Sequence, residues 1–420
     1  MKRLPVVIFV GVIVSLYYFP IGLSFLPEAL NTKMILGMIG AVLFFFDSVK
    51  TKRFGATMDM LGATGFALLF SYICYFSTDI NYTNDYSYAT YFASFFVWLG
   101  GAYSVIYLIR NIHGEANFRL LTTYLAAVCT VQCILALMID RIKPFKNLVD
   151  TYINQGQDFL NETNRLYGIG AALDSAGVRF SIVLILIAAV LSKDNTIRSD
   201  RKYMIGLLIA FFMISVVGNM ISRTTSVGMA MGFVYLIWST GILRLVIKVE
   251  NLKFFTVFII MLTIIAGVSV YLYNADESFH HNLRFAFEGF FNWMETGEWK
   301  TASTDKLNTQ MWIWPQDTKS WLIGTGIFGF FVYSTDIGYC RFILYCGLIG
   351  FSVFALFFVY NAVVFARKVK RYRWTFLLLM ALSFIVWLKV ATDIFLIYAL
   401  FYCLKEREWR DEVNPLITRR

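Results

Sequence analysis

Residues 254–273, FFTVFIIMLTIIAGVSVYLY, decide the fold class of this 420-residue chain. The run contains no charged side chain. It reaches the roughly 20 apolar residues that an α-helix needs to cross about 30 Å of hydrocarbon. The run therefore predicts a transmembrane helix.

Comparable apolar runs recur from one end of the chain to the other. They lie at residues 5–26, 33–47, 57–76, 87–109, 119–139, 178–192, 203–221, 225–246, 340–366, 374–388 and 391–404. Hydrophobic residues make up 58% of the chain and charged residues only 15%, whereas roughly a quarter of a soluble domain is charged. The sequence predicts an all-α integral membrane protein whose residues 1–420 form a single transmembrane domain.

The number of crossings depends on the last two runs, which are short. Lys389 and Asp393 indicate either a tight hairpin between two helices or one long helix with a buried ion pair. We therefore expect a polytopic bundle of roughly 10–12 transmembrane helices. The first apolar run has no small-residue cleavage site before the next polar turn, so we expect it to remain as a helix.

The formal net charge of +10 follows the loops and does not indicate a nucleic-acid-binding face. Basic residues cluster at Lys50–Arg53, Arg110–Arg119, Lys193–Lys202, Arg244–Lys253 and Arg367–Arg373, and at both ends of the chain. Because cytoplasmic loops are enriched in Lys and Arg, we expect these loops and both termini to face the cytoplasm. The six cysteines lie in or beside apolar runs without CxxC pairs, which indicates core packing.

Two long segments, residues 140–177 and 274–339, are then expected on the extracytoplasmic side. Loops of this length are usually functional or disordered. The stretch FHHNLRFAFEGFFNWMETGEW, residues 279–299, is too rich in aromatic residues for disorder. In the larger segment, 274–339, we expect short amphipathic helices at the membrane surface.

The stretch WLIGTGIFGF, residues 321–330, contains the G-x-G-x-x-G spacing of a dinucleotide-binding turn at Gly324, Gly326 and Gly329. That spacing has meaning only between a buried strand and a helix, and no βαβ pattern accompanies it here. The expected side of the membrane also lacks nicotinamide and ATP pools. We therefore expect no nucleotide cofactor, and we assign the glycines to a sharp turn and close packing before the next helix.

Four arginines stand at the expected outer ends of helices: Arg165, Arg179, Arg223 and Arg341. An ionisable residue at or within a membrane helix is costly and marks a candidate functional site. Because a guanidinium is permanently charged and forks onto phosphate oxygens, a convergent group would suit a lipid pyrophosphate at the outer leaflet. The alternative is that each arginine reaches lipid headgroups or pairs with an acid such as Asp174 or Asp336.

The outer segments also hold candidate proton acceptors. They are His280, His281, Asp276, Glu277, Glu288, Glu295 and Asp336. Histidine titrates near neutral pH, which makes His280 and His281 candidate bases, although a loop histidine is commonly only solvated. Asp336 precedes Arg341 at a helix mouth, where its other role would be a helix cap or a salt bridge. These segments contain no H-x-x-x-H, D-x-D or D-x-x-D pair, so we expect no metal site.

Four stretches, in this order, resemble the O-antigen polymerase and ligase superfamily of bacterial envelope enzymes. They are RLYGIGAALDSAG (165–177), SRTTSVG (222–228), WLIGTGIFGF (321–330) and STDIGYCRFILYCGLIGF (334–351). The family's glycine turn, polar segment and glycine-containing helix fall on Leu322–Gly326, Asp336–Tyr339 and Gly347–Gly350. The resemblance covers roughly residues 160–355, together with the helix count.

The resemblance implies a GT-C-like glycosyltransferase of the bacterial inner membrane, acting without metal or cofactor on undecaprenyl-pyrophosphate-linked oligosaccharides at the periplasmic face. It implies pyrophosphate binding at Arg165, Arg179, Arg223 and Arg341, and a general base at Asp336, His281 or His280. Ligases of the family carry a histidine where this chain has Asp336, which favours a polymerase of O-antigen or capsule repeat units. Its expected partners are membrane lipid and, as an optional protein partner, a chain-length regulator.

The implied chemistry breaks the bond between sugar C1 and the pyrophosphate, and preplaced guanidiniums stabilise the charge that builds on the leaving group. Tryptophans of the loop would stack on sugar rings, although tryptophan also favours the membrane interface for its own sake. These are Trp293, Trp299, Trp312 and Trp314. One alternative is an O-antigen ligase acting on lipid A-core. The other is a lipid-linked glycan flippase or other transporter, for which two related halves and discontinuous helices are expected, and the sequence shows neither.

Overall fold

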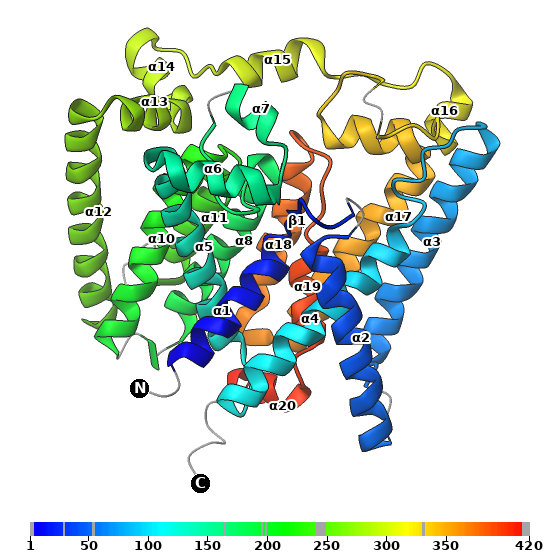
Figure 1. Cartoon of the computed structure of the whole chain (residues 1–420), viewed down its shortest axis with the longest axis horizontal. Coiled ribbons are helices and arrows are strands. Elements are labelled where there is room, and N and C mark those ends of the chain that lie inside the picture. Colours follow the sequence, from blue (N-terminus) through cyan, green and yellow to red (C-terminus); the bar gives the residue numbers. More distant parts are fainter. Residues whose placement is uncertain are drawn as a thin grey trace. The chain divides into compact units, whose positions relative to one another are not determined.

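The computed structural model describes residues 4–27, 30–52, 55–162, 165–194, 196–197, 200–240, 249–329 and 332–413 (Figure 1). The chain is 78% helical. Among the described residues, eight helices are long and apolar enough to span a membrane, and two shorter apolar helices accompany them. The mostly helical class, with helices able to span a membrane, is confirmed. The count of 10–12 crossings, the large extracytoplasmic loop and the GT-C-like arrangement stay predictions.

Part of the orientation argument concerns residues outside the described ranges. These are Lys2, Arg3, Arg53, Arg198, Arg244, Lys248, Arg419 and Arg420, together with the end of the predicted run 225–246. Core packing of the cysteines is confirmed, since five of the six are buried and Cys403 is half-buried.

The chain divides into two compact units, which are described separately. The first comprises residues 1–32, 108–299 and 408–411, and the second comprises residues 33–107, 300–407 and 412–420. The single transmembrane domain expected from the sequence stays a prediction.

The first unit contains most of the middle of the chain. Its elements are α1 Leu4–Tyr18, β1 Gly22–Leu23, α5 Phe118–Arg141, α6 Lys143–Tyr152, β2 Ile153–Asn154, α7 Gln157–Glu162, α8 Leu173–Lys193, α10 Arg201–Ile221, α11 Thr225–Thr240, α12 Val249–Ala275, α13 Glu277–Ala286 and α14 Glu288–Thr296. The short antiparallel pairing of β1 with β2 joins Gly22 to Asn154 and Leu23 to Ile153. This small ladder departs from the purely α-helical expectation.

Helix α8 forms the centre of the first unit because it is apolar on all sides. Nearly every residue from Ala176 to Ser192 is buried, and α5, α10 and α11 pack around it. Small residues let α11 approach closely, since a Cβ added at Gly228 would lie 2.1 Å from Ser181 Cα. Close contact at small residues is the usual way in which membrane helices associate.

Helix α13 begins directly after α12 and lies across its end (Figure 1). Asp276 caps α13 by accepting a hydrogen bond from the Phe279 N–H at 2.7 Å. The same carboxylate pairs with Arg141 at the end of α5. This cap and ion pair fix α13 against the end of α5, which positions the first part of the 274–339 segment.

The second unit contains the remaining elements. They are α2 Thr32–Thr51, α3 Met58–Ile80, most of α4 Tyr91–His113, α15 Ala302–Gln310, α16 Thr318–Ile323, α17 Gly338–Lys368, η2 Lys370–Tyr372, α18 Arg373–Val386 and α19 Phe395–Tyr402, while α20 Glu406–Val413 spans a unit boundary. The short helices expected between residues 274 and 339 are therefore present as α13 to α16. Helices α18 and α19 are separate, which excludes one long helix over residues 374–404.

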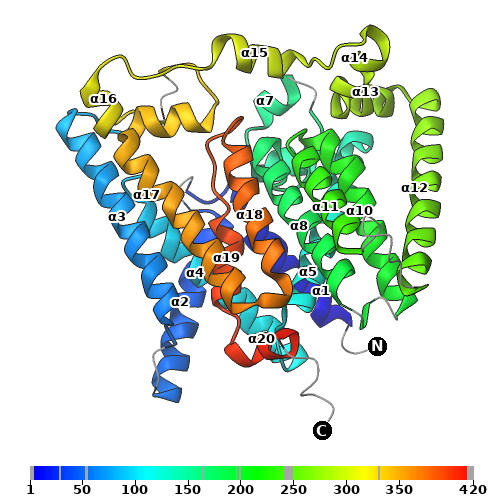
Figure 2. The same ribbon diagram turned by 180° about the vertical axis from the view of Figure 1, so that it is seen from behind.

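Helix α17 is interrupted, a feature that the sequence did not reveal. Gly347 has φ 64° and ψ −177°, outside the helical region. Figure 2 shows α17 alongside α3, with α16 next to its first turns. The sequence showed no sign of this break, because hydropathy reports the apolar run 340–366 but not the backbone direction at one glycine.

Candidate functional site

Two of the four predicted arginines, Arg165 and Arg223, contact the same aromatic ring. The guanidinium carbon of Arg165 lies 5.2 Å from the centre of the Phe285 ring, and that of Arg223 lies 4.5 Å from it. All three side chains are half-buried. An aromatic face attracts each cation, so Phe285 holds two positive charges in one place.

The corner between α10 and α11 positions Arg223. Ser222 and Thr224, on either side of Arg223, both donate hydrogen bonds to Asp174 Oδ1, at 3.1 and 2.6 Å. Asp174 lies in the first turn of α8, where the helix dipole favours a negative charge. Asp174 therefore ties this corner to α8, whereas the ion-pair partner of Arg223 is Glu288 at the start of α14.

Arg165 precedes α8 in an irregular segment. The pKa of its guanidinium is lowered, mainly by burial and also by the positive charge of Arg223. The negative charge of Asp174 opposes this shift but does not cancel it. Across the described ranges of the chain, none of the salt bridges includes Arg165. Its charge is thus available to an anionic ligand.

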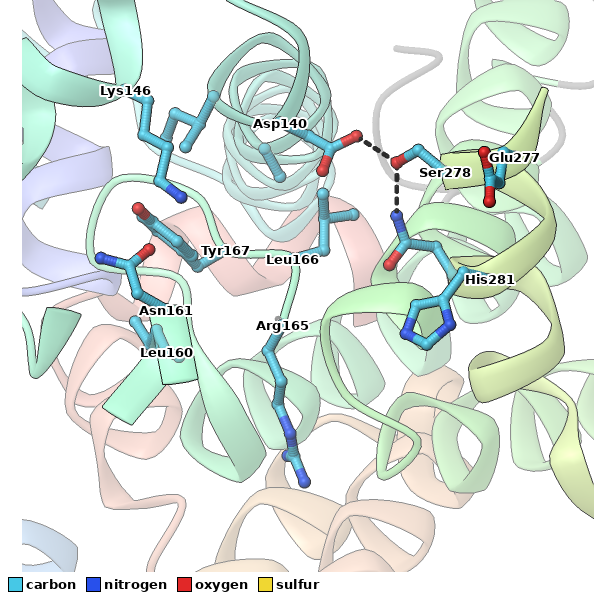
Figure 3. Close-up of a pocket in the computed structure, with 13 residues that line it drawn as sticks. Asp140, Lys146, Leu160, Asn161, Arg165, Leu166, Tyr167, Glu277, Ser278 and His281 are labelled. Atoms are coloured by element: carbon cyan, nitrogen blue, oxygen red, sulfur yellow. Dashed lines mark hydrogen bonds between the residues drawn. The ribbon is translucent and has the colours of Figure 1, made fainter. Parts of the chain in front are cut away.

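Arg165 also lines a cavity of about 480 Å³ (Figure 3). The wall includes Lys146 from α6, His281 from α13 and Tyr167 from the segment before α8. Asp140 at the end of α5 lies on the same wall and accepts a hydrogen bond from Ser278 Oγ at 2.7 Å. The cavity therefore presents two cations, a histidine and the carboxylates of Asp140 and Glu277. The cations suit an anionic group of a ligand, and the carboxylates can accept hydrogen bonds from its hydroxyl groups.

Three of the predicted proton acceptors are held in ion pairs. Arg141 lowers the pKa of Asp276 to about 2, and Arg284 lowers the pKa of Glu295. Glu288 pairs with Arg223. A carboxylate held by an arginine in this way is a weak base at neutral pH.

The remaining acceptors of the first unit lie in different surroundings. His280 stacks on Tyr273, with 4.0 Å between ring centres, and its Nδ1 lies 3.1 Å from the Tyr273 carbonyl oxygen. His281 and Glu277 line the cavity instead. The structure therefore places His281, and not His280, on the wall that Arg165 shares.

Arg179 does not join the ring of Phe285. Its guanidinium carbon lies 5.7 Å from the centre of the Phe19 ring, after the end of α1. The structure thus brings Arg165 and Arg223 together on Phe285, whereas the ring contact of Arg179 is with Phe19. The reason is geometric: Arg179 lies within α8 and its side chain leaves the helix toward the α1 side.

Arg341 and Asp336 belong to the second unit. Arg341 donates a hydrogen bond of 2.7 Å to the Phe328 carbonyl oxygen, and its guanidinium carbon lies 4.1 Å from the centre of the Phe328 ring. Asp336 is exposed, and Ile337 is the N-cap residue of α17. Within the described ranges, Asp336 takes part in no salt bridge, so neither of the structural roles considered for it is observed.

Sequence reasoning missed Phe285, Lys146, Asp85 and Phe328. Nothing in the order of letters distinguishes Phe285 from the other aromatic residues of the loop. Asp85 accepts hydrogen bonds from the backbone N–H groups of Phe328 and Gly329 in the glycine turn. A signal for it did exist, because consecutive N–H groups in such a turn favour an anion, which a nearby acid can supply.

Among the described residues, no group of three or more His, Cys, Asp or Glu side chains is placed to hold a metal ion. No protein-family model, curated protein or solved structure matches the chain.

Proposed function

We propose that the chain is a membrane glycosyltransferase that joins undecaprenyl-pyrophosphate-linked oligosaccharide repeat units into a surface polysaccharide, either O-antigen or capsule. The loop charges support an extracytoplasmic position for the two long segments, residues 140–177 and 274–339, which carry Arg165 and Phe285. The observation that carries the proposal is the pair of guanidiniums, Arg165 and Arg223, on the ring of Phe285 beside a polar cavity.

Glu288 already offsets the charge of Arg223, so the positive charge that a bound anion would meet first is that of Arg165. A pyrophosphate offers several oxygens to the forked donors of each guanidinium. Arg165 has no ion pair in the described part of the chain, whereas Arg223 can move from Glu288 to the ligand. Preplaced charge of this kind needs little reorganisation when the leaving group develops its own charge.

In the proposed reaction, an acceptor hydroxyl oxygen forms a bond to sugar C1 of the donor chain. The bond between C1 and the phosphate oxygen breaks, and the pyrophosphate keeps the electron pair. His281, which lines the cavity with Arg165, is the base best placed to take the hydroxyl proton. Asp336 stays the alternative base that the resemblance suggests.

The arginine pair is tested by Arg165→Ala and Arg223→Ala in cells that make the chain's own glycan. We expect both variants to reach the membrane but to leave single repeat units on the surface. Loss of one group that stabilises transition-state charge lowers kcat by roughly 10²–10³. The length distribution of surface glycan, resolved on a gel, measures the effect.

The matched control is Arg284→Ala. Arg284 lies on α13 close to the site, but it forms an exposed ion pair with Glu295. The control should keep the long-chain ladder, since an exposed pair contributes little. Normal long chains in both Arg165→Ala and Arg223→Ala would contradict the pyrophosphate role.

A transport function is the second candidate, because α17 is discontinuous at Gly347. Broken helices in transporters expose backbone carbonyls that bind ions or substrate. Here the carbonyls of Leu344 and Tyr345 already accept hydrogen bonds from Thr325 and Gly326. Protein donors therefore fill this break, which favours a structural role.

The same glycan assay separates the alternatives. Loss of a flippase removes surface glycan altogether, because the repeat units stay at the inner leaflet. Loss of a ligase leaves long chains on the lipid carrier that never reach lipid A-core. Only loss of a polymerase leaves single repeat units on the surface.

A further inference from the structure

The glycine turn of residues 324–329 binds an anion that belongs to the protein itself. Asp85 Oδ2 accepts hydrogen bonds from the backbone N–H groups of Phe328, at 2.6 Å, and Gly329. Asp85 Oδ1 accepts hydrogen bonds from Ser87 N at 3.1 Å and from Ser87 Oγ. Four donors therefore converge on one carboxylate that is only 4% exposed.

These donors decide the charge state of Asp85. Burial acts to raise the pKa of the carboxyl, but the hydrogen bonds from Ser87, Gly329 and Phe328 together lower it below its ordinary value. Successive N–H groups in a turn form a concave site for a negative charge. Asp85 is therefore an ionised internal ligand of the turn.

Phe328 also contacts Arg341, through its carbonyl oxygen and its ring. Its carbonyl oxygen accepts the 2.7 Å hydrogen bond from Arg341 Nη2, and its ring lies under the guanidinium. The ring of Phe328 also packs edge-on against Tyr88, with 4.7 Å between centres. Asp85 thus accepts a hydrogen bond from the Phe328 N–H, and the carbonyl oxygen and ring of the same Phe328 contact the Arg341 guanidinium.

We propose that Asp85 is a positioning residue that sets the direction of the Arg341 guanidinium through Phe328. The role of Arg341 in binding pyrophosphate is the one that the family resemblance implies, and it rests on the proposed function. The link from Asp85 to Arg341 through Phe328 does not depend on that function. A second layer of hydrogen bonds fixes the orientation of a binding group, as it does around metal ligands. A small displacement of such a group is costly to activity.

The alternative is that Asp85 only stabilises the glycine turn and has no effect on Arg341, and this alternative predicts a different result. In that case, loss of Asp85 would destabilise the unit and weaken binding by the same factor whether or not Arg341 is present. If Asp85 acts through Arg341, its loss changes nothing further once Arg341 is gone. A double-mutant cycle separates these outcomes.

The test uses the full chain in nanodiscs, with undecaprenyl pyrophosphate as the probe. We expect Asp85→Asn and Phe328→Leu each to weaken binding roughly tenfold, the usual worth of a hydrogen bond to a charged group. In an Arg341→Ala background, Asp85→Asn should add less than about twofold. An equal weakening in both backgrounds would overturn the proposal.

A second measurement does not depend on any ligand. Phenylglyoxal modifies accessible guanidiniums, and mass spectrometry follows the rate at Arg341. The rate should rise in Asp85→Asn and in Phe328→Leu, because each change releases the side chain from Phe328. An unchanged rate at Arg341 in both variants would overturn the proposal.

The matched control is Thr83→Val. Thr83 Oγ1 donates to the Gly326 carbonyl oxygen at 2.7 Å, so this variant loosens the same turn without touching Phe328 or Arg341. It should leave both the affinity and the modification rate unchanged. If the wild-type chain does not bind undecaprenyl pyrophosphate, the proposed function fails, and the modification rates still decide the link from Asp85 to Arg341.

Discussion

At the scale of single residues, partners decide which of the predicted side chains share a site. Arg165 and Arg223 meet because both pack on Phe285, whereas Arg179 packs on Phe19. The sequence indicated that each arginine was costly in a membrane helix, and that argument is local. It could not indicate which arginines share a partner, because Arg165 and Arg223 lie in connections between helices whose path depends on tertiary packing.

The charge state of Asp85 gives a pH prediction at the same scale. The pKa of Asp85 is lower in the folded chain than in the unfolded chain, where it is about 3.9. The ionised carboxylate therefore stabilises the fold fully at pH values above about 3.9. This stabilisation is lost as the pH falls through the lower pKa of the folded state. The Tm difference between wild type and Asp85→Asn should stay constant down to about pH 5 and shrink below about pH 4. Thermal unfolding in detergent, followed by tryptophan fluorescence, measures it.

A Tm difference that grows as the pH falls below about 4 would contradict this account of Asp85. Ser87→Ala provides an internal comparison, because it removes one of the four donors and keeps the carboxylate. Its Tm should lie between those of wild type and Asp85→Asn near neutral pH.

At the scale of elements, two glycines let α16 cross the break in α17. A Cβ added at Gly324 would lie 2.2 Å from the Tyr345 carbonyl oxygen, and one added at Gly347 would lie 2.2 Å from that of Leu322. Both glycines have positive φ, at 80° and 64°. The expected sharp turn and close packing are therefore confirmed at Gly324, but the packing partner is α17 itself.

This contact predicts that Gly347→Ala and Gly324→Val destabilise the protein. A positive φ with an extended ψ, as at both glycines, costs a residue with a Cβ roughly 1–3 kcal/mol, and the close carbonyl oxygens add to that cost. We expect a lower Tm for both variants and shorter surface glycan for Gly324→Val. Differential scanning fluorimetry and the glycan gel are the measurements.

Gly267→Ala is the control for the glycine variants. Gly267 lies in α12, and nothing lies within 4 Å of the position of an added Cβ. Alanine is the better helix former by about 1 kcal/mol, so this variant should keep or raise the Tm. A Tm for Gly347→Ala equal to that of Gly267→Ala would contradict the account of the break.

At the scale of the whole molecule, the sequence predicted the class of fold but not its internal division. Uncharged runs such as 254–273 identify helices without any knowledge of packing, and eight such helices are present among the described residues. Every membrane helix is apolar, whether it faces lipid or other helices. Hydropathy therefore could not reveal that α8 is central or that the chain divides into two units.

The candidate site was predictable to a similar degree. Arg165, Arg223 and His281 were predicted from residue type and expected loop position. Arg165 and His281 line one cavity, and Arg165 and Arg223 contact one ring, that of Phe285. Arg341 and Asp336 belong to the second unit. The neighbours that fix the arginines, Phe285 and Phe328, depend on tertiary contacts that a single sequence does not encode in a readable pattern.

The most direct test of the central proposal is polymer formation by the purified chain in liposomes. The substrate is the lipid-linked repeat unit isolated from cells that lack this chain, with a chelator present and no nucleotide added. We predict chains of several repeat units, release of undecaprenyl pyrophosphate with each bond formed, and loss of both with Arg165→Ala. Repeat units that stay single with folded wild-type protein would contradict the proposal.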